Sequence, residues 1–337
     1  MIKQVAVFLI KATAVAAFGA AAVFSPYALF VAAFFSGMLF MVSAYTDSKP
    51  RSLALVLISL IATVAASFSY GINISTVSLA ISTFLLTCAG GFAIGYAAKH
   101  NFSFMALISS GAACYLAPIL IWFVKYKFFD HIDILEQYVN RPVAEFFAMY
   151  NEMMSAANIE NAEAIIKLTG DLQWYMQQAV AMVLPSCFII LCALLSYLVF
   201  LLGRKLLFKA HSIALEGYPA FWQIQLSRSV SFVLAGLFII SFFMDTSAAS
   251  GAVTNIIIIL CALYMQCGIS VVDSFFRKTR IPSVLRLIIY GVALLTSGVI
   301  GMLIPFVNIP ALILFAGVTD SMFDFRHLRE GDRQNER

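Results

Sequence analysis

Long apolar runs alternate with short polar stretches along the chain. A helix needs about 20 mainly apolar residues to cross a bilayer. The runs lack the alternation of polar and apolar positions that marks membrane-barrel strands, and a helix satisfies its own backbone groups in lipid. We therefore expect membrane helices over these segments: 4–24, 26–45, 52–72, 74–97, 102–124, 174–203, 228–244, 252–274, 285–304 and 309–321. The last is short and either spans fully or forms a re-entrant or tilted piece.

One polar insertion, residues 125–173, interrupts the pattern. We expect one short helix beginning at Pro142, which suits a first turn, and a second that Asn161 caps and Gly170 ends. The sequence thus predicts an all-α, polytopic transmembrane helical bundle of about eight to ten membrane segments. It would consist of an N-terminal bundle of about five helices, the insertion, a C-terminal bundle and a cytoplasmic tail, over residues 1–124, 125–173, 174–327 and 328–337.

Composition agrees with a membrane protein. Hydrophobic residues make up 62% of the 337 residues, charged residues only 11%, and the mean hydropathy is +0.94. A soluble domain is about a quarter charged, because its surface faces water. These values exclude an ordinary soluble enzyme, a disordered chain and a nucleic-acid binder. The lipid bilayer is therefore the first expected partner.

The basic residues indicate the orientation. With the N-terminus in the cytoplasm, 16 of the 21 Lys and Arg residues fall in inner segments and four in the insertion, which follows the positive-inside rule. We therefore expect a multi-pass protein of the bacterial cytoplasmic (inner) membrane with both termini in the cytoplasm. Lys11 interrupts the first apolar run, which disfavours a cleaved secretory signal. It is close enough to the inner face to snorkel towards it.

The insertion holds eight acidic and four basic residues, a net charge of −4. One interpretation is a solvated acidic cap, and the other is a lid over a pocket that opens outward. The side chains of His131 and Asp133 could act as metal ligands, but a single histidine beside acids in a loop is usually solvated. We therefore expect no metal site.

Sequence motifs for catalysis are absent. The chain has no GxxxxGK[ST] phosphate loop and no GxGxxG, HExxH or GxSxG motif. Its six cysteines lie in apolar segments without CxxC spacing, so no metal or Fe–S cofactor is indicated. Ionisable residues are scarce in the membrane segments, and Asp273 and Asp320 lie beside Arg277 and Arg326, which favours local ion pairs. We expect neither an enzyme nor a self-powered pump.

Three sets of residues are candidates for function. Polar and aromatic side chains at the outer helix ends are candidate binding residues: Trp174, Tyr175, Gln177, Gln178, Thr254 and Asn255. Small residues on one face of the first segment allow close helix packing in lipid, either within the bundle or against a partner subunit: Ala12, Ala16 and Ala20. Asp320 and Asp324 are expected on one helical face, four residues apart, with Arg326 near enough to offset their like charges. These residues form either a structural cap at the cytoplasmic end or a partner site.

The inner stretch 204–228 combines basic and bulky apolar residues. This composition favours a helix that lies at an anionic membrane face, and docking to a partner is the alternative.

The order of motifs from about residue 160 to 327 resembles the YybS-like family of uncharacterised bacterial membrane proteins. The resemblance rests on Tyr218-Pro219-Ala220-Phe221-Trp222, on the stretch from Met265 to Lys278, and on the closing Asp320-Ser321-Met322-Phe323-Asp324-Phe325-Arg326. That family is distantly similar to the S components of energy-coupling-factor transporters, which bind a ligand from outside. In those proteins an Ala-xxx-Ala face on the first helix meets the membrane coupling subunit.

Two functions follow from these features. The first is a substrate-binding or transport-related membrane component that lacks its own ATPase and depends on a coupling subunit or another membrane protein. The alternative is a structural or regulatory scaffold for envelope or division machinery.

Overall fold

The computed structural model describes residues 2–71, 74–128, 130–156, 162–215, 217–244, 248–279, 281–282, 284–286, 288–293 and 308–328. All regular structure in these ranges is helical. The chain divides into two compact units, residues 1–217 and 218–337, and each is described by itself. The predicted all-α membrane fold is confirmed.

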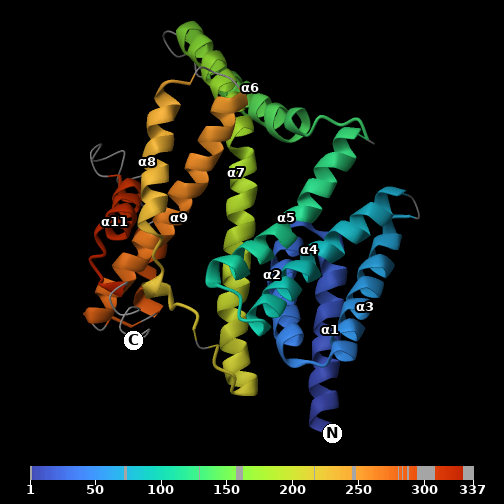
Figure 1. The fold of residues 1–337 in the computed structure, drawn as a ribbon. Helices are drawn as coiled ribbons and strands as arrows, with labels where there is room; N and C mark the ends of the chain where they lie inside the picture. Colours follow the sequence, from blue (N-terminus) through green and yellow to red (C-terminus); the bar gives the residue numbers. More distant parts are fainter. Residues whose placement is uncertain are drawn as a thin grey trace. The chain divides into compact units, whose positions relative to one another are not determined.

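The first unit begins with five helices that follow one another closely (Figure 1). They are α1 (Ile2–Phe24), α2 (Pro26–Thr46), α3 (Lys49–Ser67, followed by the short η1, Phe68–Tyr70), α4 (Ile74–Lys99) and α5 (Phe104–Phe128). All five N-terminal segments expected from the apolar runs are helical, with ends close to those expected. The helix starts carry ordinary signals, since Ser25 caps α2 and Pro26 occupies its first turn.

Glycines bring α2 and α4 together. A Cβ atom on Gly91 would overlap the backbone of Gly37, and one on Gly95 would overlap the carbonyl oxygen of Met41. Helices in lipid gain no hydrophobic effect from meeting, so close backbone approach and van der Waals contact hold them together. The Gly91–Gly95 pair therefore serves packing within the chain.

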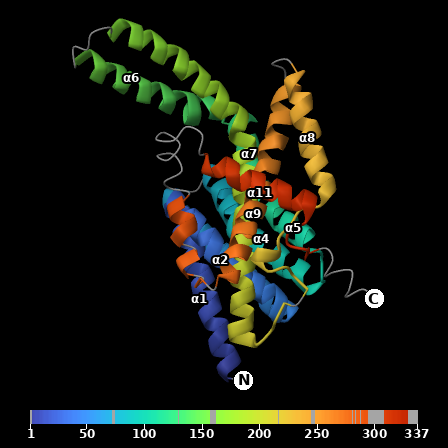
Figure 2. The ribbon, with the colours of Figure 1, turned by 90° about the vertical axis from the view of Figure 1, so that its left-hand side faces the viewer.

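The insertion forms a helical hairpin. After the wider turn η2 (Glu136–Asn140), α6 (Arg141–Ala156) lies along the first part of α7 (Ala162–His211), as Figure 2 shows. Thr169 Oγ1 donates to Asn151 Oδ1 at 2.8 Å across the pair, and Phe147 is buried. α6 contains Pro142 in its first turn, as expected.

The predicted end of the second insertion helix at Gly170 is wrong, because α7 continues through Gly170 without a break. A glycine inside a helix costs only about 1 kcal/mol relative to alanine, and the neighbouring residues favour a helix. α7 has 50 residues, about 75 Å at 1.5 Å per residue. The hydrocarbon core is about 30 Å thick, so α7 extends well beyond it. Residues 204–211 belong to its last turns and do not form a separate surface helix.

The second unit contains η3 (Phe221–Gln223), α8 (Arg228–Phe242), α9 (Ala248–Lys278), helical residues 284–286 and 288–293, and α11 (Ile309–Phe323). α9 and α11 cross closely, because a Cβ on Gly268 would overlap the Ile313 carbonyl and one on Gly317 would overlap the Tyr264 carbonyl. Of the segment expected over 285–304, residue 287 and residues 294–304 lie outside the described residues.

Within the described residues, seven helices are long and apolar enough to cross a membrane: α1 to α5, α7 and α9. α8 and α11 have 15 residues each, about 22 Å, which is shorter than the hydrocarbon core. The contacts place α7 in the first unit, whereas the sequence grouping assigned 174–203 to the C-terminal bundle.

Candidate functional site

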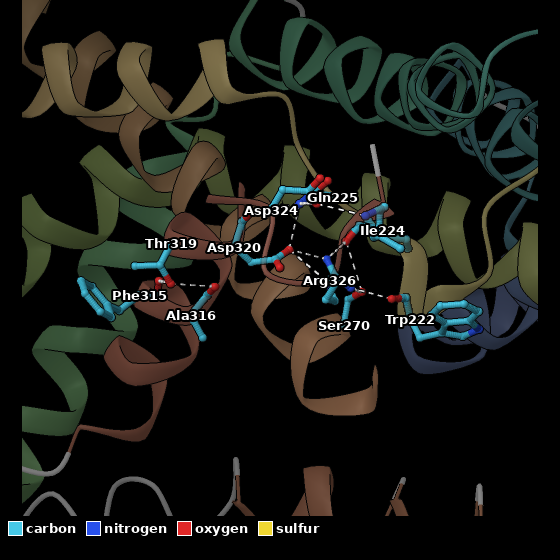
Figure 3. Close-up of polar contacts among 11 residues, drawn as sticks. Trp222, Ile224, Gln225, Ser270, Phe315, Ala316, Thr319, Asp320, Asp324 and Arg326 are labelled. Carbon is cyan, nitrogen blue, oxygen red and sulfur yellow. Dashed lines mark hydrogen bonds and ion pairs between the residues drawn. The ribbon is translucent and has the colours of Figure 1, made fainter. Parts of the chain in front are cut away.

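The terminal motif forms a buried polar cluster in the second unit (Figure 3). The side chain of Arg326 is 7% exposed and that of Asp320 is fully buried. Arg326 donates to Asp320 Oδ2 from Nε at 3.0 Å and from Nη2 at 2.7 Å. Two charges in a place with little water require mutual pairing, and the spacing of the motif supplies it. The predicted ion pair is therefore present.

Arg326 also connects distant parts of the chain. Its Nη1 donates to the Trp222 carbonyl at 2.5 Å and to Ser270 Oγ at 2.8 Å, and its Nη2 donates to the Ile224 carbonyl at 2.9 Å. With the two bonds to Asp320, all five guanidinium N–H groups have acceptors. No donor is left for an anionic ligand, so the geometry makes Arg326 a structural link between η3, α9 and the end of α11.

Gln225 joins the two acids of the motif. Its amide nitrogen donates to Asp320 Oδ2 at 3.1 Å, to the Asp320 carbonyl at 2.9 Å and to Asp324 Oδ1 at 3.0 Å. Asp324 lies just beyond α11 in the left-handed conformation, with φ 53°. The prediction that Asp320 and Asp324 share one helical face is therefore wrong, because the helix ends before Asp324. The backbone N–H of Asp324 donates to the Asp320 carbonyl at 2.8 Å, which closes the helix end.

A second ion-paired group lies nearby in the same unit. Asp273 Oδ1 is 2.6 Å from Arg286 Nη1 and accepts a hydrogen bond from Tyr290 Oη at 2.9 Å. Arg277 is 3.7 Å from Asp273 Oδ2, and its guanidinium lies 5.3 Å from the ring centroid of Trp222. The expected pairing of Asp273 with Arg277 is present, but Arg286 makes the shorter contact.

The membrane lysine of α1 is also paired. Lys11 Nζ lies 2.9 Å from Asp47 Oδ2 at the end of α2, and both side chains are largely buried. On the same helix, Ala12 is buried beside Val15 in a core with Phe40 and Leu55. Ala16 and Ala20 are half-buried. Contact of this alanine face with a partner subunit stays a prediction.

The six expected binding residues come from both units: Trp174, Tyr175, Gln177 and Gln178 lie on α7, and Thr254 and Asn255 lie on α9. Trp174 and Tyr175 are exposed. Gln177 Nε2 donates to the Asn140 carbonyl at 3.0 Å, which ties η2 to α7. Asn255 Nδ2 donates to the Gly251 carbonyl one turn earlier in its own helix. Their joint role in binding stays a prediction.

A cleft that sequence reasoning missed lies in the first unit between α5, α7 and residues 131–135. Its volume is about 710 Å³, within the range of small-molecule sites. Apolar side chains form most of its wall, and three ionisable residues, Lys127, His131 and Asp133, complete it. The apolar residues are Leu116, Ile119, Leu120, Phe123, Val124, Phe128, Ile132, Ile134, Leu135, Ala181, Leu184, Pro185, Phe188 and Ile189.

The packing of α5 and α7 explains where this cleft forms. The two helices meet tightly at Gly111, where a Cβ would overlap Ser196 Oγ, and Ser196 Oγ donates to the Ile108 carbonyl at 2.9 Å. The cleft begins just beyond, at Leu116, and extends towards the end of α5. Both helices contain an internal proline there, Pro118 and Pro185. Proline removes a backbone hydrogen bond and bends a helix. The two prolines are the sequence signal that marks this site.

The charges at the cleft are few. Asp133 Oδ1 accepts the backbone N–H groups of Leu135 and Glu136 at 2.9 and 3.2 Å, so its carboxylate caps the turn that follows. Lys125, next to the cleft, pairs with Asp130 at 3.2 Å. Among the residues that the structure describes, no three His, Cys, Asp or Glu side chains are grouped to hold a metal ion. The cleft is suited to binding an apolar or amphipathic molecule.

Comparison with known proteins gives a family and no closer relative. No curated protein and no solved structure matches the chain. A family model does match, over residues 13–316, and so extends from the middle of α1 to the first half of α11. The chain therefore belongs to the family described as predicted membrane protein (DUF2232).

Proposed function

We propose that this protein is a multi-pass component of the bacterial cytoplasmic membrane that binds a small molecule in the α5–α7 cleft. It acts by binding rather than by catalysis and depends on a membrane partner for any transport. The observation that carries this proposal is the cleft itself, about 710 Å³ with an apolar wall and ionisable residues at one end. Such a concave apolar site with a few polar groups is the usual form of a ligand pocket.

The pairing of the aspartates in or near the membrane helices supports a protein that does not itself drive transport with a proton gradient. Proton-driven carriers use ionisable residues inside the membrane. Here Asp47, Asp273 and Asp320 are each bound to a lysine or arginine, as expected of groups that hold the fold together. The resemblance to YybS-like proteins and to S components agrees with a binding subunit that a separate machine serves.

The test is ligand-dependent stability of the purified protein. A panel of vitamins, other metabolites and lipids is screened for a rise in the thermal unfolding temperature, because a ligand of the folded state stabilises it. Ala181→Trp places a large ring in the cleft wall and should abolish the shift. Ala179→Trp lies on the exposed surface of the same helix and should retain it. Equal shifts for both variants, or no stabilising compound in the panel, would count against the proposal.

One observation favours the alternative of a scaffold. α6 exposes three large apolar side chains at helical spacing, Phe146, Met149 and Met153, which are 56%, 58% and 66% exposed. Exposed apolar patches often mark protein–protein contacts. Crosslinking in intact cells followed by purification separates the two functions. A scaffold should retain one partner in a fixed ratio without ligand and lose it in the Met149→Lys variant.

A further inference from the structure

The ionisable residues of the α5–α7 cleft all lie at one end. Lys127, His131 and Asp133 fall within the last turn of α5 and the segment that follows it, whereas the walls near Leu116 and Ile189 are apolar. α5 and α7 run antiparallel, since Ser196 bonds to Ile108 and the rings of Phe123 and Phe188 lie 5.6 Å apart. Leu116 and Ile189 therefore lie towards the end of the cleft that is nearer the contact between Ser196 and Ile108. The cleft therefore has one charged end and one apolar end.

The charged end offers a cation, Lys127, that has no ion-pair partner among the described residues. Lys125 is committed to Asp130 at 3.2 Å and to Ser75 Oγ at 3.4 Å. Asp133 is committed to two backbone N–H groups, which offset its negative charge. In the described part of the chain, no carboxylate lies within ion-pair distance of the Lys127 ammonium, which lies over the Phe128 ring, 5.9 Å from its centroid. Lys127 thus remains available to an anion.

The apolar end of the cleft determines that the part of the ligand it binds is apolar. The wall extends over residues 116–128 of α5 and 181–189 of α7, about 18 and 12 Å at 1.5 Å per residue. Its side chains cannot replace the hydrogen bonds that a compact polar metabolite makes to water, and the loss of those bonds disfavours binding. An apolar chain, by contrast, gains from leaving water.

From this polarity we infer that the cleft binds an amphiphile with one anionic head group, which pairs with Lys127 while its apolar tail lies between α5 and α7. This inference rests on the proposed binding function and adds the chemical class of the ligand. Molecules of this class dissolve in the bilayer, so they can enter from the membrane.

Photolabelling tests the inference with the full chain in phosphatidylcholine nanodiscs. The probes are dodecyl phosphate and dodecanol, each with a diazirine in the tail, and the labelled peptides are mapped by mass spectrometry. Lys127→Gln removes the free cation, and Lys125→Gln, two residues away, removes a paired one. Size-exclusion profiles confirm that both variants fold.

We expect saturable labelling of 116–128 and 181–189 by the phosphate probe. Lys127→Gln should weaken its apparent affinity about tenfold, the loss of a charge-assisted hydrogen bond, and Lys125→Gln less than twofold. Dodecanol should bind all three proteins alike. Inorganic phosphate alone should not compete, because it lacks the tail.

Three results would overturn this assignment, each in a different way. Equal affinity of both probes, unchanged by Lys127→Gln, would reject the anionic head group and leave the cleft as a binding site. Competition by inorganic phosphate at the concentration of the probe would identify a free anion as the ligand. Absence of saturable labelling by any probe would reject the proposed binding function together with the ligand class.

Discussion

Arg326 and Asp320 form a buried ion pair, with Nη2 and Oδ2 2.7 Å apart and no solvent exposure of the Asp320 side chain. The pair explains the closing stretch from Asp320 to Arg326 as one structural device. Asp324 ends α11 in the left-handed conformation, which turns the chain so that Arg326 returns to Asp320. From there the guanidinium reaches the carbonyls of Trp222 and Ile224.

Replacement of Arg326 by alanine should destabilise the second unit strongly. The variant leaves a buried carboxylate without its counter-charge, which costs about 3–5 kcal/mol. Lysine in place of Arg326 keeps the charge but provides three donors instead of five, so it should restore only part of the stability. The measurement is unfolding by increasing sodium dodecyl sulfate in mixed micelles, followed by circular dichroism.

Arg277→Ala is the matched control for that prediction. Arg277 also pairs with an aspartate, but its side chain is 48% exposed and the N–O distance is 3.7 Å. Exposed pairs contribute at most about 1 kcal/mol, so this variant should remain near wild type. A similar loss of stability in Arg326→Ala and Arg277→Ala would show that the buried ion pair of Arg326 contributes no more than an exposed one.

Gly317→Ala should separate α9 from α11. A Cβ at this position would overlap the carbonyl oxygen of Tyr264, and backbone atoms cannot rotate away as a side-chain end can. We expect a loss of about 1–3 kcal/mol, the usual cost of overpacking. Gly236→Ala in α8 meets nothing within 4 Å and should be neutral or slightly stabilising, because alanine favours helices. The unfolding midpoints of the two variants in the same detergent titration provide the comparison.

Local features of the sequence predict the helices and the ion pair of the terminal motif, because both depend on neighbours in the chain. Apolar run length locates α1 to α5, and Asp320 and Arg326 are six positions apart in the sequence. Gln225 and Ser270 join this cluster from 95 and 56 residues away, and no local pattern indicates them. The cleft depends on how α5 and α7 diverge beyond Gly111, a tertiary property. The prediction that a helix ends at Gly170 is wrong because a single glycine weakens a long helix without ending it.

Replacement of Lys11 by methionine should destabilise the first unit. It leaves Asp47, whose side chain is 15% exposed, without its partner, and we expect a loss of about 3–5 kcal/mol. The double variant Lys11→Met, Asp47→Leu removes both charges and should recover most of that loss, since apolar replacements of buried pairs are often neutral. A double-mutant cycle of unfolding free energies measures the coupling. Additive losses would mean that the 2.9 Å contact contributes nothing.

Cysteine labelling should place the two ends of α7 on opposite sides of the membrane, with the insertion outside. The helix is about 75 Å long against a hydrocarbon core of about 30 Å, and its last turns carry Lys205 and Lys209, which the positive-inside rule assigns to the cytoplasm. In a background without the six native cysteines, Glu152→Cys on α6 should react with a membrane-impermeant maleimide in intact cells. Lys209→Cys should react only after the membrane is opened. The opposite pattern would invert the orientation and place the insertion, with the charged end of the cleft, on the cytoplasmic side.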